Sequence, residues 1–165
     1  MPYATVQDMI DRFGEREMIQ LSGSEGEAVV AAPIERALAD AMAMVDAFVG
    51  RIYKLPLTGC VKPAPTEEDP QATELVPPPM LTRICCDVAR YYLYDDNLVP
   101  EHEAAIRYKA AERQLLAIGD GKAVLSCPWG GEPGTLVAGS APGEGEVGYC
   151  FTPRRITDES LRGFE

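Results

Sequence analysis

Residues 80–118 read MLTRICCDVARYYLYDDNLVPEHEAAIRYKAAERQLLAI. Apolar residues recur at three- and four-residue spacing in both halves, which predicts two helices, over about 80–97 and 101–118. Pro100 suits the entry of the second helix, and only two further residues separate the pair. Because so short a connection favours antiparallel packing, we expect a helical hairpin. The expected core-facing residues are Leu81, Ile84, Cys85, Val88 and Tyr92 in the first helix, and Ala104, Tyr108, Ala111, Leu115 and Ile118 in the second.

Two further helix signals precede this hairpin. Thr5 and Asp8 have the spacing of a capping box, and apolar residues follow at helical spacing until Gly14, after which a further turn is expected. Another helix is predicted from Pro33, which suits a first helical position, to Gly50, which suits a C-terminal stop. One face of this helix is rich in alanine, so a neighbouring backbone, of the same or another chain, can approach it closely.

Two segments contain too much proline and glycine for long regular structure. Seven prolines and several acids occupy residues 56–79, which predicts a solvated, largely extended loop. Residues 122–165 predict an extended Gly/Pro-rich C-terminal arm, with 135–138 and 146–151 as a candidate β-hairpin. The expected fold is mainly α: a helical body of four or five helices over residues 1–121 that contains the acidic loop, followed by the arm.

Composition limits the functions open to the chain. Its 165 residues include 26 acids and 15 bases, a formal charge of −11 at pH 7. This charge disfavours a free-standing nucleic-acid binder, because affinity for phosphate comes largely from Lys and Arg. No apolar run approaches the roughly eighteen residues of a membrane span, so no membrane role is expected. Five cysteines, an odd number, with no signal-peptide-like start before them, predict unpaired thiols in a reducing compartment.

Catalytic and metal-binding patterns are weak, so we expect no enzyme, no cofactor and no metal site. The one histidine, His102, lies between glutamates at the start of an expected helix, an exposed place with no nucleophile pattern nearby. Cys85 and Cys86 are adjacent, so at most one is expected to face the core, and their spacing does not suit zinc. Residues 143–148 match GxGxxG, but Glu144 and Glu146 stand where phosphate would approach and no helix is expected to follow, so a turn is expected there.

The C-terminal arm carries residue types that dominate interfaces. A central, desolvated aromatic or arginine side chain contributes about 2 kcal/mol or more to an interface. Docking on another chain is therefore favoured, and the alternative is that the arm folds back onto its own helices. The candidate partner-binding residues are Trp129, Phe151, Arg154, Arg155, Leu161 and Phe164, with Arg90 and Tyr94 as candidates for either core support or a ring interface.

A further set of residues, spread over most of 3–121, is characteristic in its order and spacing rather than in any one motif. Its members are Tyr3-Ala4-Thr5, Asp8, Arg12-Phe13-Gly14, Ala37, Asp40-Ala41, Asp46, Tyr53, Leu55-Pro56-Leu57, Asp87-Val88-Ala89-Arg90-Tyr91, Leu93-Tyr94-Asp95-Asp96 and Arg107-Tyr108. In these residues the sequence resembles a small Mu-like phage family, long carried as a domain of unknown function, whose members are held to be head-tail connector or adaptor proteins. The acidic stretch 58–78 is longer than the link expected in that family.

The resemblance implies an adaptor-like helical bundle that forms a ring, a dodecamer, below the portal in the neck of a tailed phage or prophage virion. Its partners would be further copies of itself, the portal protein and the next neck or tail protein, after synthesis in the host bacterial cytoplasm. DNA would pass through the channel without specific binding. An acidic chain suits this role, because carboxylates on the channel wall repel phosphate.

Three other functions stay open. A head-closure stopper or a tail-terminator protein is compatible with the same composition. A DNA-binding regulator would use the hairpin of residues 80–118, and DNA binding at low salt would distinguish it. A hydrolase of unknown type would depend on His102.

Overall fold

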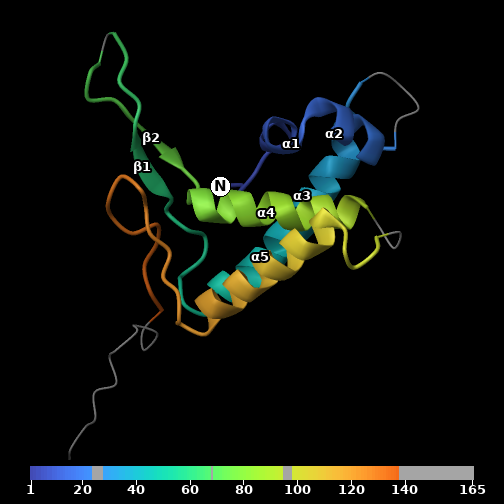
Figure 1. The fold of residues 1–165 in the computed structure, drawn as a ribbon. Coiled ribbons are helices and arrows are strands. Elements are labelled where there is room, and N and C mark those ends of the chain that lie inside the picture. Colours follow the sequence, from blue (N-terminus) through green and yellow to red (C-terminus); the bar gives the residue numbers. More distant parts are fainter. Residues whose placement is uncertain (24–27, 68, 95–97, 138–165) are drawn as a thin grey trace, which may run out of the picture.

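Figure 1 shows the computed structural model, which describes residues 1–23, 28–67, 69–94 and 98–137. The predicted mainly α fold is confirmed, since the described residues form five helices and one two-stranded antiparallel sheet. No helix in these ranges is long and apolar enough to cross a membrane. In chain order the elements are α1 (Val6–Phe13), α2 (Glu15–Leu21), α3 (Ala31–Val49), β1 (Cys60–Pro63), β2 (Thr73–Val76), α4 (Pro79–Leu93) and α5 (Glu103–Gly119).

The predicted capping box begins α1 and is confirmed. The Thr5 hydroxyl accepts a hydrogen bond from the Asp8 backbone N–H, and the Asp8 carboxylate accepts one from the Thr5 backbone N–H at 2.7 Å. Gly14 ends α1 and precedes α2 with a φ of +88°, a conformation that glycine adopts without strain. Met9 and Met18 are fully buried, so this glycine lets two short helices direct apolar residues into one core.

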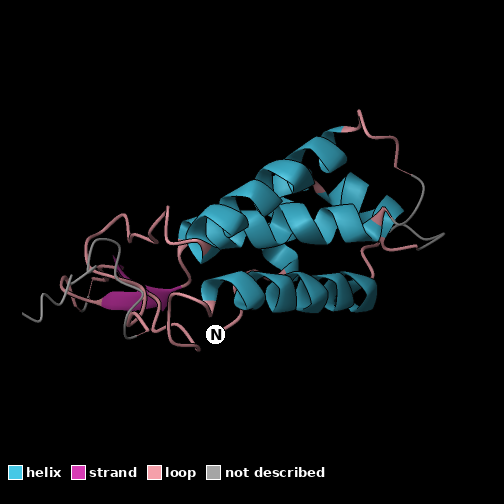
Figure 2. Ribbon diagram, turned by 90° about the horizontal axis from the view of Figure 1, so that it is seen from below, coloured by secondary structure: helices cyan, strands magenta, loops and turns pink. Residues whose placement is uncertain are grey.

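The central helix α4 packs against α3, α5 and α1, and Figure 2 shows the helices gathered beside one another with the sheet at one end. Because α4 has neighbours on several sides, Cys85 and Cys86 are both buried. The expectation that at most one of these thiols faces the core is therefore wrong. Tyr92, predicted to face the core, is instead 37% exposed.

The hairpin of α4 and α5 is confirmed. Tyr91 of α4 stacks on Tyr108 of α5, with ring centroids 4.2 Å apart. The described part of the first helix ends at Leu93, and residues 95–97 lie outside the described ranges. The second helix begins at Glu103, two residues later than predicted, because the His102 side chain caps its first turn.

The prediction of a largely extended loop over residues 56–79 needs a correction, because β1 and β2 pair within it. Val61 lies opposite Leu75 in the antiparallel register, and Cys60 lies opposite Val76. The prolines do not prevent this pairing, since Pro63 is the last residue of β1 and others lie in the turn or beyond β2.

The described part of the C-terminal arm, residues 122–137, folds back along its own chain. Leu136 forms an isolated antiparallel bridge with Tyr53, and the Tyr53 hydroxyl accepts a hydrogen bond from the Leu125 backbone N–H at 2.8 Å. Residues 135–137 therefore pair with the segment after α3. Their predicted partner, 146–151, lies outside the described ranges. Further backbone bonds run from Lys54 to Thr135, from Gly59 to Pro133 and from Val137 to Ile52.

Candidate functional site

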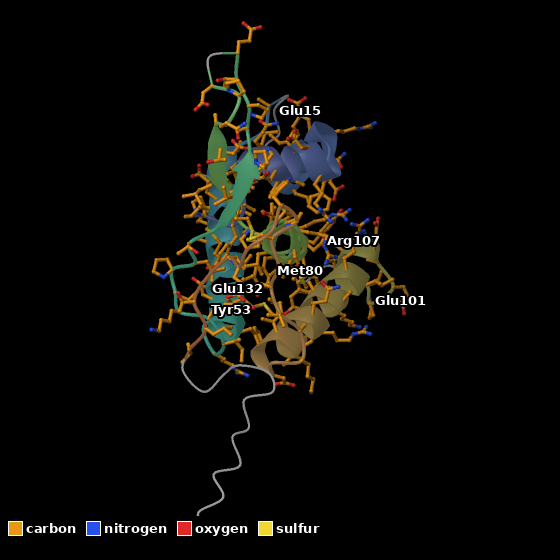
Figure 3. The ribbon with its side chains drawn as sticks, turned by 90° about the vertical axis from the view of Figure 1, so that its left-hand side faces the viewer. Glu15, Tyr53, Met80, Glu101, Arg107 and Glu132 are labelled. Atoms are coloured by element: carbon orange, nitrogen blue, oxygen red, sulfur yellow. A yellow bond between two sulfur atoms is a disulfide. The ribbon has the colours of Figure 1, made fainter. Side chains whose placement is uncertain are left out.

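A groove with a volume of about 580 Å³ lies where the N-terminal segment, the β-hairpin formed by β1 and β2 (below, the hairpin) and the start of α4 meet. Met80 marks the start of α4 in Figure 3, and Tyr53 and Glu132 mark the region where the returning arm meets the segment after α3. We call the groove the Trp129 groove, after the tryptophan in its lining. Its apolar lining includes Met1, Pro2, Leu75, Val76, Pro77 and Trp129, and its charged lining consists of Asp8, Arg12, Lys62 and Arg83.

A disulfide between Cys60 and Cys127 fixes one side of the Trp129 groove. Cys127 is two residues before Trp129, so the bond holds the tryptophan loop against β1. The loop then turns through Gly130 and Gly131, whose φ angles of +96° and +82° are in the left-handed region that favours glycine. Trp129 remains 42% exposed and faces the groove with a rigid anchor behind it.

The disulfide overturns part of the cysteine prediction. Unpaired thiols were expected throughout, but Cys60 and Cys127 are paired across 67 positions of sequence. A pairing this distant depends on the hairpin and on the return of the arm, so spacing gave no signal for it. Cys85 and Cys86 are free thiols, and burial raises the pKa of each to about 12. Cys150 lies outside the described residues.

The N-terminal segment that lines the groove is anchored to α3. The Tyr3 hydroxyl donates a 2.5 Å hydrogen bond to an Asp46 carboxylate oxygen. Burial of the Tyr3 ring, reinforced by this hydrogen bond, raises the pKa of Tyr3 above its ordinary value. The wall of the groove is therefore held by contacts with the helical core as well as by the disulfide.

The hairpin adds exposed apolar side chains at the groove. Leu75, which lines it, is 61% exposed. Val61 is its cross-strand partner and is 51% exposed. Because directly opposite residues of an antiparallel pair lie on the same face, these two side chains form one apolar surface on the hairpin.

Cations outnumber carboxylates in the lining. The Lys62 ammonium pairs with Glu74 at 2.6 Å, both side chains being exposed. The Arg83 guanidinium donates a hydrogen bond to the Gln114 side-chain oxygen at 2.6 Å. Because glutamine is neutral, this contact does not neutralise the charge of Arg83. The groove thus combines apolar surface with the Arg83 guanidinium, whose described hydrogen bond is to a neutral group, in a chain of formal charge −11.

Arg90 and Tyr94, two predicted contact residues, meet at a different place, between α2 and α4. Both donate hydrogen bonds to the same Glu17 carboxylate oxygen, at 2.6 Å from Arg90 Nε and 3.0 Å from the Tyr94 hydroxyl. Burial lowers the pKa of Arg90, but the hydrogen bond and charge of Glu17 outweigh it, so the pKa is raised. Arg90 is only 6% exposed and lies 4.6 Å from the Phe13 ring centroid, which favours the core-support alternative.

Sequence reasoning missed Asp87 as a charged core residue. It is buried in α4, with its Oδ1 atom 3.5 Å from Arg12 Nε and 3.7 Å from Arg107 Nη1. Among the described contacts, Oδ1 has no hydrogen-bond partner. The sequence feature that could have identified Asp87 is a single acid among the apolar residues of a helix that is expected to be buried. Asp87 thus links α1, α4 and α5 by charge.

The remaining candidates have these positions. His102 is half-buried rather than exposed: its Nδ1 accepts from the Ala104 backbone N–H, and its ring lies 4.8 Å from that of Tyr94. Within the ranges that the structure describes, no group of three or more His, Cys, Asp or Glu residues is arranged to hold a metal ion. The candidates Phe151, Arg154, Arg155, Leu161 and Phe164 lie outside those ranges, as do residues 143–148.

Comparison with known proteins extends over nearly all of the described chain. The family described as Bacteriophage Mu, Gp36 matches residues 3–137, a range that holds all five helices, the hairpin and the Trp129 loop. Gene product J of Escherichia phage Mu is 30% identical over 152 residues, which cover 88% of this chain and 86% of that protein. The chain therefore belongs to the Bacteriophage Mu Gp36 family and is a distant homologue of Mu gene product J.

Proposed function

We propose that this phage protein is a structural head-tail connector, an adaptor that forms a ring below the portal and continues the DNA channel towards the tail. The observation that carries the proposal is the Trp129 groove, in which a partly exposed tryptophan lies beside apolar and cationic side chains on a loop that the Cys60–Cys127 disulfide anchors. An aromatic residue on a rigid support is the kind of residue that contributes most to protein interfaces. Membership of a phage family is consistent with a role inside a virion.

The proposed work is joining and sealing rather than catalysis. The protein would be made in the host cytoplasm and assemble in the virion neck with further copies of itself, the portal protein and the next neck or tail protein. A groove on one copy and a different surface on the next make heterologous contacts, and such contacts form a ring when the rotation between copies closes. The formal charge of −11 per copy favours a channel wall that repels DNA phosphate, so that DNA passes without specific binding.

The decisive experiment is a null mutation of the gene in a phage or inducible prophage that carries it, followed by electron microscopy of the lysate. We expect heads and tails that do not join, restored to whole particles by the wild-type gene. The purified wild-type neck should contain a ring of this protein directly below the portal. Its absence from the neck would overturn the proposal.

The same experiment separates the two rival neck functions. Loss of a tail terminator leaves tails of abnormal length, and that phenotype would contradict the adaptor role. A head-closure stopper lies below an adaptor, so a wild-type neck in which another protein separates this protein from the portal would support the stopper and contradict the adaptor role.

A point variant tests the groove itself in the same assay. We expect Trp129→Ala to lower the yield of joined particles while the purified protein stays folded. Val124→Ala, which also truncates an exposed apolar residue but lies outside the groove lining, is the matched control and should leave the yield unchanged.

A further inference from the structure

We propose that the Trp129 groove of one copy binds residues 157–165 of a neighbouring copy, with Leu161 and Phe164 as apolar anchors. This inference rests on the proposed ring, because it specifies the contact between adjacent copies. A groove and a tail are different surfaces, so the contact is heterologous and repeats around a closed circle.

The groove offers an apolar surface suited to such a ligand. Trp129 and Leu75 line it and are 42% and 61% exposed, and Val61 extends the apolar surface along the β1–β2 hairpin. Contiguous exposed apolar surface marks a binding site in a soluble domain. Because the Cys60–Cys127 disulfide already orders the tryptophan loop, binding costs less conformational entropy there than on a mobile loop.

The charge of the groove selects an acidic ligand. Arg12, Lys62 and Arg83 line it together with the Asp8 carboxylate. Arg12 lies 3.5 Å from the buried Asp87 carboxylate, whereas Arg83 donates its hydrogen bond to the neutral Gln114 side chain, so Arg83 is the cation best placed to meet an acidic ligand. The ion pair of Lys62 is solvent-exposed, and exposed pairs contribute only about 1 kcal/mol or less, so its ammonium can bind a further carboxylate.

Residues 157–165, which read TDESLRGFE, meet both requirements. They contain three acids and one arginine, and two large apolar side chains, Leu161 and Phe164, three positions apart. The preceding stretch, 151–156, reads FTPRRI and carries two arginines with no acid, so the groove cations disfavour it. The chain continues for many residues beyond Val137, and at up to about 3.5 Å per residue it has the length to reach an adjacent copy.

Cross-linking between two full-length variants tests the contact directly. One variant carries Leu75→Cys and an added mass tag, and the other carries Phe164→Cys, both with Cys150→Ser to remove a competing thiol. After mixing and treatment with a short bis-maleimide, we expect a product of mixed mass that joins the two variants. Ile106→Cys, at an exposed position on α5, replaces Leu75→Cys in the control and should give no more than background yield.

The product identifies the source of the bound segment. A chain that carries both Leu75→Cys and Phe164→Cys should also link mainly to other chains. Products confined to the mass of one chain would mean that the segment occupies its own groove, and equal yields from the Leu75→Cys and Ile106→Cys variants would mean that the groove is not its site. Either result overturns the inference.

Assembly provides a second readout and separates this inference from the proposed function. We expect the double variant Leu161→Asp, Phe164→Asp to raise the protein concentration needed for half-maximal ring formation by about tenfold or more, because two anchors lose their apolar contacts. Ser140→Asp adds charge to the tail outside residues 157–165 and should have no such effect. Rings formed by the double variant at wild-type concentration overturn the inference and leave the adaptor role intact, whereas absence of wild-type rings from virion necks overturns the adaptor role.

Discussion

At the scale of single residues, a few buried or half-buried charged and polar side chains connect the helices of an otherwise apolar bundle. The Glu17 carboxylate receives hydrogen bonds from both Arg90 and Tyr94, which joins α2 to α4. Asp87 places a carboxylate between Arg12 and Arg107. A buried charge is costly unless it is paired. The pairs of Glu17 with Arg90 and of Asp87 with Arg12 and Arg107 therefore fix the positions of α1, α2 and α5 relative to α4.

We expect Arg90→Met to lower the free energy of unfolding by about 2 kcal/mol, because it leaves the Glu17 carboxylate without its cation while keeping much of the apolar stem. Denaturant unfolding followed by circular dichroism measures the change. Lys62→Met, which breaks an exposed ion pair, is the control and should cost well under about 1 kcal/mol. Equal effects of the two substitutions would contradict the structural role of Arg90.

The buried thiols predict a loss of stability in alkali. Burial raises the pKa of Cys85 and Cys86 from the ordinary value of 9 to about 12, so above pH 9 the unfolded chain holds fewer protons than the folded chain. This contribution is fully present below pH 9 and decreases as pH rises towards 12. Melting temperatures between pH 8 and 10.5 should therefore fall more steeply for wild type than for the variant Cys85→Ala, Cys86→Ala. Parallel curves would contradict burial of the thiols.

At the scale of elements, short helices and a short hairpin depend on their ends. Thr5 and Asp8 satisfy backbone donors at the start of α1, which has only eight residues and is too short to be stable alone. We expect Thr5→Ala to cost about 1 kcal/mol of unfolding free energy. Thr73→Ala, at an exposed position at the start of β2, is the matched control for thermal denaturation. A smaller loss for Thr5→Ala than for Thr73→Ala would contradict the capping role.

The disulfide is the connection between the hairpin and the tryptophan loop. In the double variant Cys60→Ser, Cys127→Ser, the unfolded chain regains the freedom of a 67-residue span, which corresponds to at most about 4 kcal/mol. Trp129 is the chain's one tryptophan, so its fluorescence reports on the loop alone. We expect red-shifted emission with little change in helical circular dichroism, and no shift for Cys150→Ser. Unchanged emission in the double variant would show that other contacts hold the loop.

At the scale of the whole molecule, net charge governs the response to DNA. The formal charge of −11 opposes binding, and the positive groove is small beside the acidic remainder. We expect no retardation of a duplex DNA in a gel at about 50 mM salt, where phosphate contacts are strong. Retardation under these conditions would instead support a DNA-binding regulator.

The sequence by itself determined the helices. Apolar spacing in α4 and α5, the capping box at Thr5 and the stop near Gly50 are local signals, because each depends on residues within a few turns of one another. Family membership likewise follows from the order of residues along the chain.

The tertiary structure alone decided the contacts between distant segments. It paired Cys60 with Cys127, buried both Cys85 and Cys86, formed β1 and β2 within a proline-rich stretch and brought Trp129 to the N-terminal segment. Periodicity reports which face of an element is apolar, but not which other element covers it. The groove arises from three segments that are far apart in sequence, so its existence depends on how the chain returns upon itself.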